Sequence, residues 1–206
     1  MDEIKPIAHA VSRGFFPGSR YRLFVTQSCR PSMFFYFLIA NENGELMIEG
    51  TENEKFENEY SLLFGHMNGE ETAFTLISED GLEIVSAVAV QKPLMALGKD
   101  GSVIKMRLAT SKVDCFLVQC TGLNPNENFK YISTICHKKD QHTSAADAKG
   151  NWQTMLYPAV IGLEGGFGSL QIRRENGDDL KVNYLWGKDA IKVTRKEIEK
   201  NNSNKS

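Results

Sequence analysis

The hydrophobic residues of this chain fall into short segments separated by polar turn residues. In the segment 180–186, Leu180, Val182 and Tyr184 alternate with polar residues. Such alternation predicts a β-strand with one buried face and one solvent-facing side. With β-branched and aromatic enrichment as the second criterion, strands are predicted at 21–25, 33–39, 45–48, 60–64, 73–77, 84–90, 113–120, 129–135, 156–161, 169–173 and 180–186. The pattern therefore predicts an almost entirely β protein.

Two turn sequences predict how strands pair. Glu79-Asp80-Gly81 separates 73–77 from 84–90, and Glu175-Asn176-Gly177-Asp178 separates 169–173 from 180–186. Asp-Gly and Asn-Gly are favoured at the positive backbone angles of hairpin turns. Each pair is predicted to be a β-hairpin. Helical composition is confined to 189–200, beyond which a disordered end is predicted.

The two halves of the chain resemble each other weakly. The matched positions are Pro31 with Pro125, Phe35 with Phe129, Phe37 with Tyr131, Gly65 with Gly162 and Gly81 with Gly177, at offsets of 94 to 97 residues. This offset is too long for a solenoid repeat and suits a duplicated domain. Internal duplication is therefore predicted.

These patterns together predict an all-β fold of two tandem immunoglobulin-like β-sandwich modules related by internal duplication, with a short C-terminal helix or disordered tail. The predicted modules are 1–95 and 96–190, followed by a basic, partly disordered tail at 191–206. The Pro- and Gly-containing stretch 93–102 is either the linker or a strand leading into the second module. The Cys…Trp…Cys signature of antibody domains is absent.

Composition narrows the class of protein. Of the 206 residues, 41% are hydrophobic and 24% charged, which is ordinary for a globular protein. The apolar runs are too short for a membrane-spanning helix, so none is predicted. Residues 1–100 hold 8 basic and 15 acidic residues, and residues 101–206 hold 16 and 11. The basic residues are dispersed and accompany no nucleic-acid-binding motif, so nucleic-acid binding is not expected. The favoured explanation of this charge asymmetry is a solvated acidic loop and a basic tail. Head-to-tail association of the two oppositely charged halves, or an acidic partner for the tail, is the alternative.

The cysteines do not follow the repeat. They are Cys29, Cys115, Cys120 and Cys136, and free thiols are expected because Cys115 and Cys120 are too far apart on one predicted strand to bond. Turn-rich modules of this kind are typical of extracytoplasmic bacterial proteins. A mature periplasmic or secreted fragment is therefore favoured slightly over a cytoplasmic protein.

Few residues are candidates for chemistry. His137, Asp140 and His142 are weak candidates for metal ligands, because their spacing suits neither a helix nor a strand and two lysines intervene. A solvated loop is the favoured interpretation of this segment. The segment 162–168 is rich in glycine but lacks the following helix of a phosphate-binding loop, and is interpreted as a turn or bulge. No catalytic residue, metal site or cofactor is predicted.

Aromatic side chains are the remaining candidates. Alternation along 33–39 predicts that Phe35 and Phe37 share one face of a strand and that Phe34 and Tyr36 share the other. A strand with two apolar faces is either central in a sandwich or part of an interface. The partner-binding candidates are Phe15, Phe16, Phe34, Tyr36 and Trp152.

The leading hypothesis is a non-enzymatic protein-interaction or assembly module. It would bind a protein partner, or another copy of itself, by an exposed aromatic surface or by edge-strand addition. The alternative is a ligand- or metal-binding protein or an enzyme with a site between the two modules.

Overall fold

The computed structural model describes residues 14–28, 30–51, 55–56, 67–90 and 92–203, with side chains described as far as residue 196. It contains three antiparallel sheets and a single C-terminal helix, α1 (Gly187–Ser203). The predicted all-β class is therefore confirmed. Duplicated immunoglobulin-like sandwiches stay a prediction. The chain divides into two compact units, residues 1–63 with 71–90 (unit 1) and residues 64–70 with 91–206 (unit 2).

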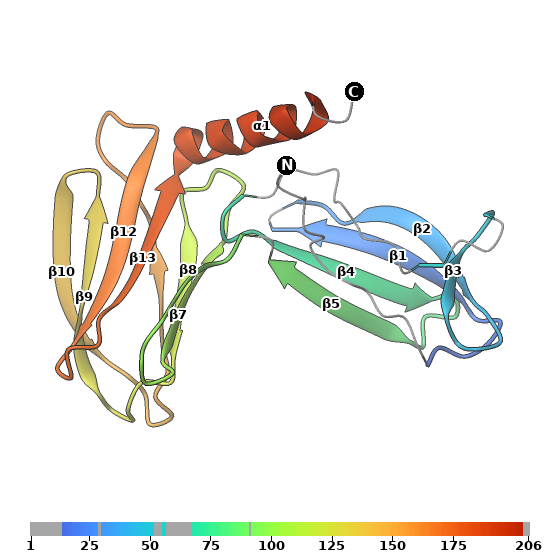
Figure 1. Ribbon diagram of the computed structural model, residues 1–206, viewed down its shortest axis with the longest axis horizontal. Helices are drawn as coiled ribbons and strands as arrows, with labels where there is room; N and C mark the ends of the chain where they lie inside the picture. Colours follow the sequence, from blue (N-terminus) through green and yellow to red (C-terminus); the bar gives the residue numbers. More distant parts are fainter. Residues whose placement is uncertain (1–13, 29, 52–54, 57–66, 91, 204–206) are drawn as a thin grey trace. The chain divides into compact units, whose positions relative to one another are not determined.

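Unit 1 contains one five-stranded sheet, drawn in blue to green in Figure 1. Its strand order is β3-β2-β1-β4-β5. The strands are β1 (Arg20–Gln27), β2 (Met33–Ala40), β3 (Leu46–Ile48), β4 (Glu71–Ser78) and β5 (Ile84–Val90). Buried residues of one face, among them Tyr21, Leu23 and Leu38, pack with Leu46 and Phe56 to form the core of this unit.

A β-bulge in β2 changes which aromatic side chains lie together. Leu23 is paired with Tyr36 and Phe24 with Phe34, so the strand has one extra residue at this point. Phe34 and Phe37 consequently share a face, with ring centroids 4.8 Å apart. Phe35 packs against the core cluster instead. The predicted alternation, with Phe35 beside Phe37, is wrong because the bulge shifts its phase.

Unit 2 is a β-sandwich of two four-stranded sheets. One has the order β10-β9-β12-β13 and the other β11-β8-β7-β6. The strands are β6 (Leu94–Leu97), β7 (Val103–Leu108), β8 (Phe116–Thr121), β9 (Asn128–Ile135), β10 (Lys138–Ala145), β11 (Trp152–Leu156), β12 (Gly165–Arg174) and β13 (Leu180–Trp186). Ile104 and Val118 from one sheet and Ile172 and Val182 from the other lie in one core cluster.

An ion-pair network lies at the end of β12. The Arg174 side chain is fully buried and donates to both carboxylate oxygens of Glu127, at 2.7 and 2.8 Å. It also donates to Asp100 at 2.6 Å and to the Ser102 hydroxyl at 3.0 Å. Arg174 thereby links the turn after β6 and the start of β9 to the end of β12.

The helix α1 begins directly after β13. Gly187 has a φ of +60°, and a Cβ there would lie 2.1 Å from the Glu164 carbonyl oxygen. Only glycine fits this close approach. The helix predicted at 189–200 is confirmed, and it continues to Ser203. No helix in the described part of the chain is long and apolar enough to cross a membrane.

Several predicted elements differ from the structure. The segment 138–145 is strand β10 rather than a solvated loop, because it pairs along its length with β9. The turn that joins them contains Cys136 at a φ of +55°, a conformation that the residue type does not signal. Strand β7 was not predicted, and β11 ends at Leu156, where the predicted strand 156–161 begins. The predicted strand 60–64 lies outside the described residues.

Candidate interaction surface at the β5 edge

Strand β5 is an edge strand of the unit 1 sheet, with β4 as its partner among the described strands. Its sequence, Ile-Val-Ser-Ala-Val-Ala-Val, has no charged residue. Every residue except Ala89 is exposed, and Val88 retains 60% of its accessible surface. Long, uncharged and exposed edges readily accept another strand.

The hydrogen-bond pattern of the β4–β5 hairpin indicates which backbone groups of β5 point outward. The Ser78 N–H donates to the Glu83 carbonyl at 3.0 Å, one step beyond the pair of Ile77 with Ile84 that ends the register. Because bonded and non-bonded pairs alternate in antiparallel ladders, Val85, Ala87 and Ala89 bond to β4. The N–H and C=O groups of Ile84, Ser86, Val88 and Val90 therefore point away from β4, toward the side of β5 on which no described strand is paired.

Other edge strands carry features that discourage strand pairing. The β10 edge contains Lys138, Lys139 and Asp140. At the β3 edge, Met47 forms an isolated β-bridge with Lys55. Strand β13 includes Lys181, β11 includes polar Gln and Thr, and β6 is only four residues long. Charge and short length are the usual protections of sheet edges. Among the described edge strands, β5 alone combines seven residues with an entirely non-polar or small side-chain set.

An apolar face adjoins this edge. The cross-strand register places Phe24, Phe34, Phe37, Ile84 and Val88 on one face of the unit 1 sheet, which we call the outer face. Phe34 is 48% exposed, with its ring centroid 6.0 Å from that of Phe24. A bound strand at β5 would extend this face.

Polar contacts border the outer face. The Arg20 guanidinium lies 3.9 Å from the centroid of the Phe37 ring, within the range of a cation–π interaction. Arg20 also pairs with Glu49 at 2.7 Å and Glu79 at 2.9 Å. The hydrogen bond to Glu49, opposed by desolvation and reinforced by Glu79, raises the pKa of Arg20.

The structure does not bring the predicted aromatic anchors together. Phe34 lies on the outer face, whereas Tyr36 is paired with buried Leu23 on the other face. Phe15 contacts Tyr21, with ring centroids 5.0 Å apart, and packs on the core. Phe16 is 68% exposed in the segment before β1. Trp152 belongs to unit 2.

Two features of this surface were not predicted from the sequence. Phe37 shares the outer face with Phe34 because of the bulge. The 84–90 strand itself was predicted, but its role as a binding edge was not. The signal was available, because an uncharged run of β-formers that directly follows a hairpin turn is a candidate for an unprotected edge.

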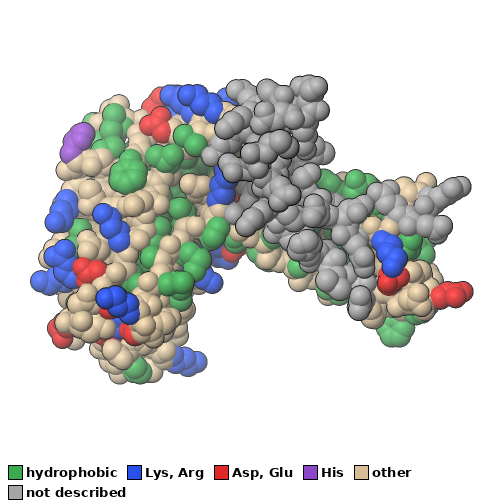
Figure 2. All heavy atoms as spheres, viewed as in Figure 1, with side chains coloured by type: hydrophobic (Ala, Val, Ile, Leu, Met, Phe, Trp, Pro, Cys, Tyr) green, Lys and Arg blue, Asp and Glu red, His purple; other side chains and the backbone are tan. Residues whose placement is uncertain are grey.

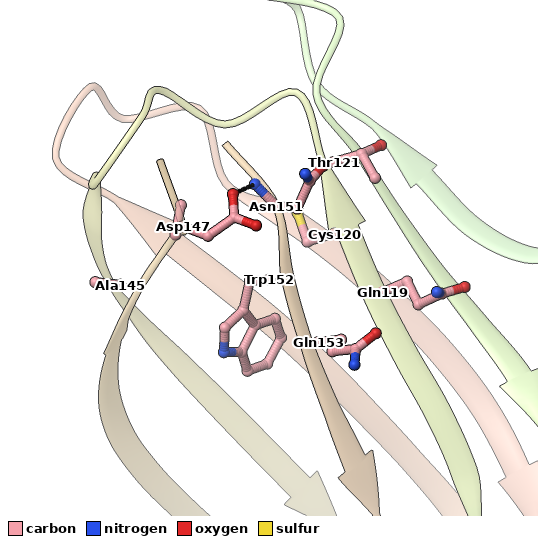
Figure 3. Close-up of a pocket in the computed structure, with 9 residues that line it drawn as sticks. Gln119, Cys120, Thr121, Ala145, Asp147, Asn151, Trp152 and Gln153 are labelled. Atoms are coloured by element: carbon pink, nitrogen blue, oxygen red, sulfur yellow. Dashed lines mark hydrogen bonds between the residues drawn. The ribbon is translucent and has the colours of Figure 1, made fainter. Parts of the chain in front are cut away.

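A cavity of about 610 Å³ lies beside Trp152 in unit 2 (Figure 3). The indole packs against Phe129 and Tyr131, with ring centroids 5.3 and 5.1 Å apart. Trp152 and Gln153 are neighbours on β11 and point to opposite sides of it (Figure 3). The indole and the glutamine side chains of the lining therefore do not converge on one ligand.

The two titratable groups of this cavity are held in structural roles. Burial raises the pKa of the Cys120 thiol to about 11, which keeps it neutral and poorly nucleophilic. Asp147 accepts the backbone N–H groups of Asn151 and Lys149, both at 2.8 Å, and these bonds lower its pKa. The Asp147 carboxylate thus stabilises its own turn.

The weak metal-ligand candidates are also dispersed. His137 lies in the turn before β10, and Asp140 and His142 lie on β10. The His142 ring stacks on Tyr131, with centroids 5.0 Å apart. The described residues contain no group of three or more His, Cys, Asp or Glu side chains that could hold a metal ion. Among the described cysteines, Cys115, Cys120 and Cys136, no disulfide is present.

On the face of unit 2 seen in Figure 2, hydrophobic side chains lie among basic and acidic ones rather than in one continuous patch. The β5 edge and the outer face are therefore the strongest candidate site.

The comparisons with known proteins give no close relative of this chain. No family model and no curated protein sequence matches the chain. A solved structure described as a tetra-tandem repeat in the extending region of a large adhesion protein is 11% identical, with a TM-score of 0.29. The similarity covers 84% of this chain and 42% of that one, so the chain spans less than half of the neighbour.

Proposed function

We propose that this protein is a non-enzymatic interaction module that binds an extended segment of a protein partner by strand addition at β5. The observation that supports this proposal is the exposed, uncharged β5 edge with outward-pointing backbone groups. An incoming strand supplies the missing hydrogen bonds, each worth about 1 kcal/mol net.

Side chains of the outer face supply selectivity in this proposal. Ile84 and Val88 flank Ser86 on this face, and the Ser86 hydroxyl is engaged by Thr75 at 3.0 Å. A partner strand with β-branched side chains on the same face would pack against Ile84 and Val88. Charged side chains at those positions would be desolvated without a partner and are selected against.

Unit 2 would act as the second module of the proposed scaffold. Strands β7, β8 and β11 of one sheet, with β10, β9, β12 and β13 of the other, follow the Greek-key strand order of immunoglobulin-like sandwiches. This order supports an immunoglobulin-like module, and the matched prolines before β2 and β9 support duplication. A periplasmic or secreted location accompanies the proposal.

A generic strand peptide tests strand addition. The probe is a fluorescein-labelled peptide of about eight alternating Thr and Val residues, flanked by lysines for solubility. We expect saturable binding by fluorescence anisotropy. Ser86→Pro removes one outward N–H and should weaken binding about tenfold, which corresponds to the loss of one net hydrogen bond.

Ser86→Thr is the matched control, because it keeps the N–H and the hydroxyl while favouring the strand conformation. We expect it to bind the peptide like the unmodified protein. Equal binding by the Ser86→Pro protein, or no saturable binding by the unmodified protein, would contradict the proposal.

A further inference from the structure

We infer that the occupant of the β5 edge is the β5 strand of a second copy of this chain, paired antiparallel about a two-fold axis at Ala87. This inference rests on the proposed strand addition and specifies its partner. It is argued from the backbone register, the side chains that would be opposed, and the other edge of the unit 1 sheet.

The backbone register fits self-pairing. The outward N–H and C=O groups belong to Ile84, Ser86, Val88 and Val90. In an antiparallel pair centred on Ala87, Ile84 is opposite Val90 of the second copy and Ser86 is opposite its Val88. All outward groups within the strand are then bonded. Centring the pair on Ser86 would place Val90 opposite the turn residue Leu82, so Ala87 gives the longest ladder.

The opposed side chains are compatible. In an antiparallel two-fold pair, residues near the axis lie close to their own copies, so a charge there would meet a like charge. Strand β5 has none. By contrast, β10 carries Lys138, Lys139 and Asp140, and strand pairing would desolvate these charges. Ala87, on the axis, is opposite a second alanine, which leaves room for close approach.

The other edge of the sheet limits the assembly to two copies. At that edge β3 has three residues, and Met47 is bridged by Lys55. Among the described strands of unit 1, a third copy therefore finds no second edge equivalent to β5. An isologous contact of this type closes as a dimer rather than growing into a fibre.

Cysteine cross-linking tests both the partner and the register. Residues directly opposite at a non-bonded antiparallel position have Cα atoms about 4.5 Å apart, within disulfide range. We expect Ala87→Cys to form an intermolecular 87–87 disulfide under mild oxidation, assigned by peptide mapping against the natural cysteines. Ser86→Cys alone should not form a self-disulfide, but a mixture of Ser86→Cys and Val88→Cys proteins should cross-link.

Sedimentation provides the readout without cysteines. At about 50 µM, where a micromolar association is populated, the unmodified protein should sediment as a dimer. Val88→Lys and Ser86→Pro should each raise the dimer dissociation constant at least tenfold. Ser86→Thr is again the control, and its dimer should persist.

The outcomes separate the inference from the proposed function. A monomer that still binds the Thr-Val peptide overturns self-pairing and leaves strand addition standing. A monomer that binds no peptide overturns both. A dimer that persists in Ser86→Pro and Val88→Lys without an 87–87 cross-link overturns pairing through β5.

Discussion

At the scale of single residues, the strongest polar contacts are those of Arg174. Its guanidinium holds Glu127, Asp100 and Ser102, which are 47 to 74 residues away along the sequence. The hydrogen bond from Arg174 lowers the pKa of Glu127, and burial opposes this effect. Hydrogen bonds from Ser102, followed by those from Arg174, lower the pKa of Asp100. The network ties three separate parts of unit 2 to one side chain.

Breaking this network should destabilise unit 2. Arg174→Met leaves the Glu127 carboxylate, which is only 10% exposed, without its counter-charge. Removing one partner of a buried pair costs about 3 kcal/mol or more. We expect a loss of about that size in the free energy of unfolding, measured by urea titration with tryptophan fluorescence. Glu127→Gln, which keeps a hydrogen-bond acceptor, should lose less, and an equal loss would contradict this account.

The same pair predicts a pH dependence. The pKa of Glu127 is lower in the folded protein than its ordinary value of 4.5. Its stabilising contribution is therefore complete above about pH 4.5 and is lost as the pH falls through the folded pKa. Below pH 4.5 the stability of the unmodified protein should fall more steeply than that of Glu127→Gln. Parallel pH profiles would exclude Glu127 as a contributor.

The β2 bulge marks the limit of residue-level prediction. Alternation predicts the face of each side chain correctly only while the register of the strand is unbroken. One extra residue reverses the predicted face of every residue beyond it. Nothing in the local sequence around Phe35 specifies the bulge, since each of these aromatic residues suits either face. Phe34 and Phe37 lie on the same face because of how β2 pairs with the neighbouring strand β1 on each side of the bulge.

At the scale of elements, strands with both a clear pattern and a clear turn were predicted well. The strands 84–90 and 180–186 match β5 and β13 at both ends. Strand β10 was not predicted, because its polar side chains are mostly exposed and the sequence pattern depends on burial. The candidate edge at β5 is likewise a property of pairing, which the periodicity of a single strand does not contain.

Two proline substitutions in β5 should differ sharply. Ala87 bonds to β4, so Ala87→Pro removes a ladder bond and should cost about 3 kcal/mol in unit 1. Ser86→Pro removes an outward N–H and should cost less than about 1 kcal/mol. Hydrogen exchange of β4 peptides, followed by mass spectrometry, should rise in Ala87→Pro and stay near the unmodified level in Ser86→Pro. If exchange rose in Ser86→Pro and not in Ala87→Pro, the backbone groups of Ser86, rather than those of Ala87, would bond to β4.

At the scale of the whole molecule, the chain does not complete one unit before starting the next. Residues 64–70 belong to unit 2, although strands of unit 1 precede and follow them. Met67 is part of the unit 2 core, and the Gly69 carbonyl accepts the Leu108 N–H at 2.8 Å. Composition and periodicity do not predict that a segment between two unit 1 strands belongs to unit 2. A short segment contributes to a core only through tertiary contacts.

This connectivity makes a prediction about Gly69. It has a φ of +76°, and a Cβ there would lie 2.9 Å from the Met106 carbonyl oxygen. Gly69→Ala therefore combines backbone strain with a steric clash, and should cost about 2 kcal/mol. Both tryptophans, Trp152 and Trp186, lie in unit 2, so tryptophan fluorescence follows the unfolding of that unit. We expect Gly69→Ala to lower the fluorescence-detected unfolding midpoint.

The matched control is Gly81→Ala in the β4–β5 turn. Gly81 has a similar φ of +73°, but a Cβ there would meet no atom within 4 Å, and the turn belongs to unit 1. Its backbone strain should leave the tryptophan-detected midpoint unchanged, because that signal comes from the other unit. If Gly69→Ala also left the midpoint unchanged, residues 64–70 would not stabilise unit 2. If both variants lowered it equally, the two units would unfold as one cooperative body rather than separately.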